Sequence, residues 1–231
     1  MGPCLVAGVL HCLVDLASER EIGSMQFFQR RRWIDPDRLM EGHAAFVRQL
    51  EWIDAHTNMD MAGWRLADSD PLGAILATTT YDDHDWFLAE KEYLQTLSAY
   101  GPVNNAAASL TVGEDTLWQI LHVAGEMGVL PNVLTYIRWQ AAPSQLMAAI
   151  EFAAGMADFS SGVTGATTTV SACQWGYPNG IGLITGYDSV SAQQAASIAV
   201  GADSGFAERL AASADIGRPE TIETGVLRRI L

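Results

Sequence analysis

The sequence predicts an α+β fold in which two β-α-β-β-α-β units follow one another along the chain and pack sheet against sheet. Strand-like and helix-like segments occur in the same order in both halves of the 231 residues. The pair Arg32-Trp33 recurs as Arg138-Trp139, and Tyr81-Asp82 recurs as Tyr187-Asp188, each at an interval of 106 residues (138 − 32 and 187 − 81). A repeat of this length is a whole small domain, longer than a usual solenoid unit.

The expected domain organisation has three parts. Residues 1–24 form an N-terminal extension, 25–128 the first half and 129–231 the second half. The apolar segment 1–17 has no basic start and is too short to span a bilayer as a helix. An additional helix or an upstream extension is therefore favoured over a signal peptide.

In the first half, 26–33 is rich in aromatic residues and reads as a strand. Asp35-Pro36 starts a helix, because a carboxylate suits the N-cap and proline suits the first helical position. That helix carries Leu39, His43, Phe46, Leu50 and Ile53 at helical spacing. The other expected elements are strands over 61–67, 72–81 and 116–124, and a helix from Asp82 or Asp83 to Tyr100 that Gly101-Pro102 ends.

The second half repeats this order. The expected strands are 133–139, 167–177, 181–187 and 221–231. The expected helices are 143–157, with Leu146, Ile150 and Ala154 turned inward, and a helix capped by Ser191 that runs to Ala212. Each half is then a four-stranded antiparallel sheet with two helices on one face. The bare face needs cover, and packing the two sheets together gives a closed or nearly closed barrel with four helices outside.

This element order, with a strand-Pro-helix start and a sheet-to-sheet partner, resembles the dimeric α/β-barrel superfamily of ferredoxin-like proteins over residues 25–231. The superfamily includes cofactor-independent quinol monooxygenases, polyketide cyclases, NIPSNAP-like proteins and haem proteins similar to chlorite dismutase. The resemblance implies two ferredoxin-like units fused in tandem, and it does not fix a function.

Charge and cysteine content narrow the class of partner. The net charge is −14, with 27 acidic and 13 basic side chains, which argues against nucleic acid and against anionic membranes. The basic run Arg30-Arg31-Arg32 lies in a predicted strand, so its side chains alternate between faces. Cys4, Cys12 and Cys173 are sparse and form no CxxC pair, which favours a reducing, cytoplasmic setting without a cysteine metal site. A monomer or a homodimer is expected.

Motifs for common cofactors and hydrolases are missing from the sequence. There is no GxGxxG, GxxxxGK[ST], HExxH or GxSxG. The segment from Tyr81 to Asp85 is rich in metal-type ligands, but aspartates at a helix start are explained better by capping. We therefore expect neither a metal site nor a nucleotide cofactor.

Candidate functional residues are those predicted to reach the barrel interior. Trp118 and His122 share one face of their strand, where His122 could act as a general base or a haem ligand. Alternation places a further group on one face of 167–177, suited to stacking on and hydrogen bonding an aromatic ligand. The predicted catalytic residues are His122, Tyr177 and Cys173. The predicted substrate-binding residues are Trp64, Trp118, Ser171, Trp175, Arg32 and Arg138.

Each of these residues also has a structural interpretation. His122 suits a satisfied core histidine, and the face with Cys173 suits ordinary barrel filling. Arg32 and Arg138 could capture an anion or pair with the abundant carboxylates.

Three functions remain open. The favoured one is an enzyme that binds a planar aromatic or polyketide-like substrate in the barrel and acts as a monooxygenase or cyclase without a cofactor. The alternatives are a non-catalytic ligand-binding or interaction module, and a haem-binding barrel protein.

Overall fold

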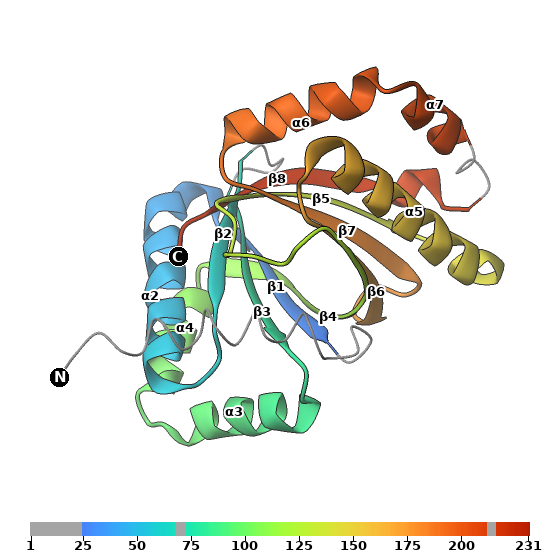
Figure 1. Ribbon diagram of the computed structural model, residues 1–231. Coiled ribbons are helices and arrows are strands. Elements are labelled where there is room, and N and C mark those ends of the chain that lie inside the picture. Colours follow the sequence, from blue (N-terminus) through green and yellow to red (C-terminus); the bar gives the residue numbers. More distant parts are fainter. Residues whose placement is uncertain (1–24, 68–72, 212–215) are drawn as a thin grey trace. The chain divides into compact units, whose positions relative to one another are not determined.

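A computed structural model describes residues 25–67, 73–211 and 216–231 (Figure 1). The extension expected at 1–24 lies outside these residues. The strands are β1 (Gln26–Ile34), β2 (Ala62–Leu66), β3 (Ala74–Tyr81), β4 (Thr111–Ala124), β5 (Val133–Gln140), β6 (Thr168–Trp175), β7 (Gly180–Tyr187) and β8 (Glu223–Arg229). The α-helices are α2 (Leu39–His56), α3 (His84–Thr96), α4 (Tyr100–Ala108), α5 (Leu146–Thr164), α6 (Val190–Ala202) and α7 (Ser204–Ala211). Short 3-10 helices are η2 (Pro36–Arg38), η3 (Pro143–Gln145) and η4 (Pro219–Thr221).

The strands form a closed barrel with the order β1-β3-β2-β8-β5-β7-β6-β4. Neighbouring strands pair antiparallel, as in β1 with β3 and β4, and in β7 with β5 and β6. The helices lie outside the strands (Figure 1). The predicted α+β fold of two ferredoxin-like β-α-β-β-α-β units is confirmed.

The chain divides into two compact units, and three strands are split between them. The N-terminal unit contains the described residues of 25–119 together with 173–178 and 224–231. The C-terminal unit contains those of 120–172 and 179–223. Strands β4, β6 and β8 therefore each contribute residues to both units.

The N-terminal unit buries one face of its sheet under helices. Phe46, Leu50 and Ile53 of α2 are buried in one core with Phe28 of β1. The ring of Phe28 also lies 5.3 Å from that of Phe87 on α3. Since side chains alternate along a strand, the neighbours of Phe28 on β1 point to the other face, called here the helix-free face of this unit.

The predicted helix start at Asp35-Pro36 is confirmed. The Asp35 carboxylate accepts a hydrogen bond from the Asp37 amide at 3.0 Å, and Pro36 opens η2, which continues into α2. Asp83 caps α3 by accepting from the amides of Asp85 and Trp86. The acidic segment after Tyr81 therefore has the capping role that was favoured for it.

The C-terminal unit packs α5 on its sheet through small side chains. Ala149, Ala153 and Ala157 are fully buried against a core that includes Trp139 and Ile181. The predicted inward stripe of Leu146, Ile150 and Ala154 was displaced by one position, because alanines bring the helix backbone closest to the sheet while Leu146 and Ile150 pack at the flank.

Several predicted element boundaries were wrong. Gly101-Pro102 does not end a helix but lies in the first turn of α4, where a missing proline N–H is tolerated. The single helix expected to reach Ala212 is divided at Asp203 into α6 and α7. The N-cap of α6 is Ser189 and not the predicted Ser191. The Ser189 hydroxyl accepts a hydrogen bond from the Ala192 amide at 3.1 Å.

Other elements differ from prediction in length. Strand β4 begins at Thr111 rather than at 116. Helix α5 does not end at 157 but continues to Thr164, and the next residue, Gly165, ends it in a left-handed conformation. The last strand begins only at Glu223, because η4 occupies the residues before it.

Candidate ligand-binding site

Two tryptophans of the N-terminal unit are fixed by threonines on the helix-free face. Trp64 on β2 is 1 % exposed, and its indole Nε1 donates to Thr78 Oγ1 on β3 at 2.9 Å. Trp118 on β4 is 3 % exposed, and its Nε1 donates to Thr116 Oγ1 at 2.8 Å. An indole N–H can only donate, so each ring is held in one orientation by its threonine.

Gln29 of β1 connects the two pairs. In the sheet register Gln29 lies directly opposite Thr78 on one side and Thr116 on the other. The Thr116 hydroxyl donates to Gln29 Oε1 at 3.3 Å. Side chains opposite one another in an antiparallel sheet share a face. We call Gln29, Trp64, Thr78, Thr116 and Trp118 the tryptophan–threonine row.

Three residues predicted from β6 and the turn after it lie in the same unit. The ring of Tyr177 lies 6.1 Å from that of Trp118 at an interplanar angle of 37°. The Cys173 Sγ lies 3.1 Å from the carbonyl oxygen of Trp175 and 3.5 Å from that of Leu117. The Trp175 side chain is exposed, at 62 %. Of these three, Tyr177 has a ring contact with the row.

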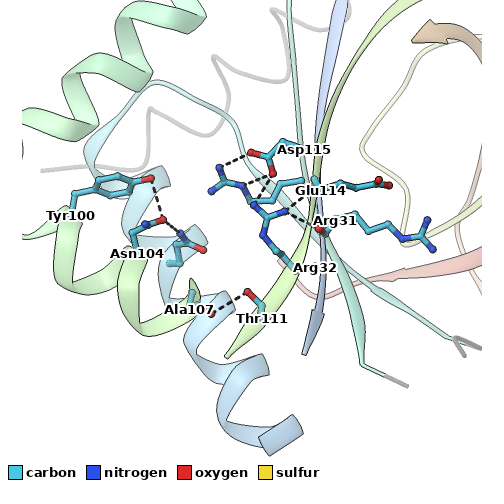
Figure 2. A network of polar contacts seen from close by, with 10 residues as sticks. Arg31, Arg32, Tyr100, Asn104, Ala107, Thr111, Glu114 and Asp115 are labelled. Atoms are coloured by element: carbon cyan, nitrogen blue, oxygen red, sulfur yellow. Dashed lines mark hydrogen bonds and ion pairs between the residues drawn. The ribbon is translucent and has the colours of Figure 1, made fainter. Parts of the chain in front are cut away.

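Arg32 belongs to an ion-pair cluster with Arg30 and Asp115 (Figure 2). Arg32 Nη2 lies 2.7 Å from Asp115 Oδ1, and Arg30 donates to the same carboxylate through Nε and Nη2 at 3.2 and 2.9 Å. Burial alone would raise the pKa of Asp115, but the hydrogen bonds and charges of the two arginines bring that pKa below its usual value. This geometry matches the structural interpretation of Arg32.

Arg31 points the other way, as alternation in β1 requires (Figure 2). Its guanidinium lies over the Trp33 ring at 4.9 Å, and the residue is 8 % exposed. Arg31 stands five residues before Pro36, as Arg138 stands five before Pro143. By spacing to the proline and by burial, Arg31 and not Arg32 corresponds to Arg138.

Arg138 and Ser171 lie together in the C-terminal unit. Both are buried, and both face Gly182, from β5 and from β6. Arg138 Nη2 donates to Glu223 Oε1 at 3.0 Å. Both predicted anion-binding arginines therefore engage a carboxylate of their own unit.

His122 is part of a different pair. Its Nε2 lies 2.7 Å from Asp158 Oδ1 on α5, within the C-terminal unit, and about a third of its side chain is exposed. The predicted pairing of His122 with Trp118 on one site rested on strand alternation alone. The structure joins His122 to a helix carboxylate and joins Trp118 to Thr116 and Tyr177.

Gln29, Thr78 and Thr116 are not among the site residues predicted from the sequence. A signal for Thr116 was present, because it precedes Trp118 by two residues in a predicted strand and so shares its face. For Gln29 and Thr78 no comparable signal exists, because their position opposite one another depends on the register between β1 and β3.

Comparison with known proteins gives a fold and no close relative. No family model matches the chain, and no curated protein matches it. A candidate monooxygenase from Fusobacterium nucleatum matches with a TM-score of 0.66 and 10% identity, over 90% of this chain and 93% of its own. An anthrone oxidase-like protein matches with the same TM-score and identity, over 90% and 91%. A variant of chlorite dismutase from Candidatus Nitrospira defluvii matches with a TM-score of 0.51 and 13% identity, over 92% and 93%.

No helix among residues 25–67, 73–211 and 216–231 is long and apolar enough to cross a membrane. The similar structures match nearly their whole length at identities far below those that carry function. The chain thus shares the fold of the dimeric α/β-barrel proteins, including monooxygenase-like members, with two ferredoxin-like units in one polypeptide.

Proposed function

We propose that the protein binds a planar aromatic small molecule against the tryptophan–threonine row and oxygenates or cyclises it without a cofactor. The carrying observation is the pair of indoles, Trp64 and Trp118, each fixed by a threonine. Both rings are almost fully covered by protein, so a ligand would have to displace covering side chains, and the fixed orientation of the indoles then lowers the entropic cost of stacking. The fold shared with an anthrone oxidase-like protein and a candidate monooxygenase supports this choice of reaction class.

Tyr177 is the residue best placed for proton transfer among the three predicted to be catalytic. Its ring contacts that of Trp118, so its hydroxyl belongs to the same part of the N-terminal unit. In the proposed oxygenation, a methylene between aromatic rings loses two hydrogens and becomes a carbonyl. One atom of O₂ enters the product and the other leaves as water. Tyr177, after giving up its own hydroxyl proton to solvent, would accept the first proton from the methylene as a phenolate and so act as the general base.

The test is incubation of the purified protein with anthrone in air, with product formation followed by absorbance and binding followed by tryptophan fluorescence. Trp118→Leu and Trp64→Leu should weaken binding roughly two- to tenfold, since an aromatic pair contributes about 0.5–1.5 kcal/mol. Tyr177→Phe should bind normally and turn over slowly. Trp52→Phe is the matched control, because Trp52 lies on α2 stacked with His56 at 4.0 Å.

The possible results separate the candidate functions. Binding without turnover would support a ligand-binding module and contradict the enzyme. If the protein neither binds nor turns over anthrone, and neither binds nor turns over a quinol such as 1,4-naphthohydroquinone, the proposal is contradicted. Haem receives no support at His122, because the Nε2 atom that an iron would take is engaged by Asp158 at 2.7 Å. We therefore propose no haem.

A further inference from the structure

We propose that helix α6 is the surface through which two copies of this chain associate as a dimer. The contact lies within the C-terminal unit and is independent of the proposed ligand site, so it goes beyond the proposed function. Three observations carry it: α6 has no charged side chain, an isoleucine projects from its middle, and the chain as a whole is strongly acidic.

Helix α6 carries no charge, although most of its side chains are exposed. Its 13 residues include no Asp, Glu, Lys or Arg, and its buried residue is Ala196. Helices α2 and α3 of the N-terminal unit each carry four charged side chains. A helix on a protein surface normally turns charged residues to water, and depletion of charge is typical of the centre of a protein interface. The outer face of α6 therefore has the composition of a surface that a partner covers.

Ile198 lies near the middle of α6 and points away from the strands that α6 covers. Ala196 is the buried position of the helix, and Ile198 follows it by two residues, a rotation of about 200° around the helix axis. Ile198 is accordingly 73 % exposed. Gln194 precedes Ala196 by two residues and is turned outward for the same reason. The outer face of α6, as the term is used below, consists of Ser191, Gln194, Ile198, Gly201 and Ala202, all exposed.

The uncharged surface belongs to α6 and not to the whole helix layer of its unit. Helix α6 lies outside β5 and β7 and beside α5 (Figure 1). The exposed side of α5 includes the carboxylates of Glu151 and Asp158, whereas Asp188 and Asp203 stand just beyond the two ends of α6. A helix of 13 residues is about 20 Å long, so a contact confined to α6 is small.

The net charge of −14 favours a second copy of this chain as the partner. Copies of an acidic protein repel each other where their carboxylates approach. A two-fold symmetric contact brings the same patch of both copies together, so that patch must be complementary to itself. An uncharged face with an exposed isoleucine meets this condition, and an acidic face does not. The outer face of α6 also offers no charge that would select a partner of opposite sign.

Sedimentation equilibrium of the full chain measures the dimer. A contact of this size lies at the small end of stable interfaces, so we expect a monomer–dimer equilibrium with a Kd of roughly 1–100 µM. Raising the ionic strength from about 0.01 M to about 0.15 M shortens the Debye length from about 30 Å to about 8 Å. This change should lower the Kd, because the copies repel each other and the contact itself contains no ion pair. A contact made of ion pairs would respond in the opposite direction.

Ile198→Glu and Gln194→Glu each place a carboxylate on the outer face of α6 in both copies. We expect either variant to raise the Kd at least about tenfold, because the carboxylates must lose water and approach each other across the two-fold axis. Gln194→Glu changes the shape of the side chain least, so it tests the contact even if Ile198→Glu does not fold. Gln95→Glu is the matched control, since Gln95 is exposed on α3 of the N-terminal unit and the variant adds the same charge. It should leave the Kd nearly unchanged.

Each possible result supports or overturns the dimer. A dimer that both α6 variants weaken and the control leaves intact would support it. An unmodified protein that stays monomeric at about 1 mM, roughly ten times the highest expected Kd, would overturn it. A dimer whose Kd is the same in both α6 variants as in the unmodified protein would place the contact on another face and overturn it as well. A monomer that sediments with phosphatidylcholine vesicles would show that α6 binds a membrane surface and not a second copy.

Discussion

Asp115 is a single residue that stabilises the pairing of β1 with β4 in the N-terminal unit. Its carboxylate receives three hydrogen bonds or ion pairs from Arg30 and Arg32, and only about a fifth of each side chain is exposed. Charge-assisted, bidentate contacts of this kind are stronger than neutral hydrogen bonds. The cluster joins β1 to β4 through side chains on the strands that also carry Gln29 and Thr116.

We expect Asp115→Asn to lower the free energy of unfolding by about 1–3 kcal/mol at neutral pH, the cost of leaving charged donors without their acceptor. The pKa of Asp115 is lower in the folded protein than in the unfolded chain. Its contribution is therefore complete above about pH 4 and is lost as the pH falls through the folded-state pKa. Urea unfolding at several pH values should show the deficit of the variant narrowing below about pH 4.

The control for this experiment is Glu41→Gln, which breaks the exposed pair with Arg38 and should change stability much less, because exposed ion pairs contribute little. A deficit of Asp115→Asn that does not depend on pH would show that the ion pairs are not its cause.

Helix caps determine where several helices begin. The N-cap of α6 is Ser189, whereas the sequence predicted Ser191. Ser189→Ala should lower the stability by about 1 kcal/mol, because the Ser189 hydroxyl accepts from the first turn of α6. Ser191→Ala should cost less, about 0.5 kcal/mol, because Ser191 makes only an exposed hydroxyl–hydroxyl hydrogen bond with Ser189 at 3.0 Å and caps no amide. Thermal unfolding of the two variants, which differ only in position, checks this. A larger loss for Ser191→Ala would contradict the assigned cap.

Two glycines of neighbouring elements give different expectations. A Cβ on Gly113 of β4 would lie 2.1 Å from the backbone oxygen of Arg31, so Gly113→Ala must separate β1 from β4. We expect a loss of about 1–3 kcal/mol, as for other overpacked sites.

A Cβ on Gly101 of α4 would meet nothing within 4 Å. Gly101→Ala should therefore change stability by less than about 1 kcal/mol, because alanine favours the helix while the ring of the following Pro102 disfavours helical backbone at a residue with a Cβ. Chemical denaturation of both variants measures the contrast. Equal effects would show that the approach of β4 to β1 is looser than described.

At the scale of the whole molecule, the order of elements could be predicted because it depends on local patterns. Alternation identified the strands, and Asp35-Pro36 marked a helix start that the structure confirms. The division of the second half's last helix at Asp203 was not predictable from spacing, since an apolar stripe continues across it. Gly101-Pro102 was ambiguous for a physical reason, because proline suits both the end of one helix and the first turn of the next.

The candidate site could be predicted only in part. Aromatic residues in strands pointed to Trp64, Trp118 and Tyr177, two of which the structure places in ring contact. The position of Gln29 opposite both Thr78 and Thr116 depends on two strand registers. Neither register is encoded in local sequence, because register is set by long-range packing.

The most direct measurement of the central claim is a ¹H–¹⁵N spectrum of the tryptophan indoles, recorded with and without anthrone. The chain has seven tryptophans, and substitution to phenylalanine assigns the Nε1 signals of Trp64, Trp118 and Trp52. The account predicts that the ligand shifts the signals of Trp64 and Trp118, whose N–H groups are bonded to Thr78 and Thr116, and leaves that of Trp52 in place. Unchanged Trp64 and Trp118 signals at a saturating concentration of the ligand would contradict the account.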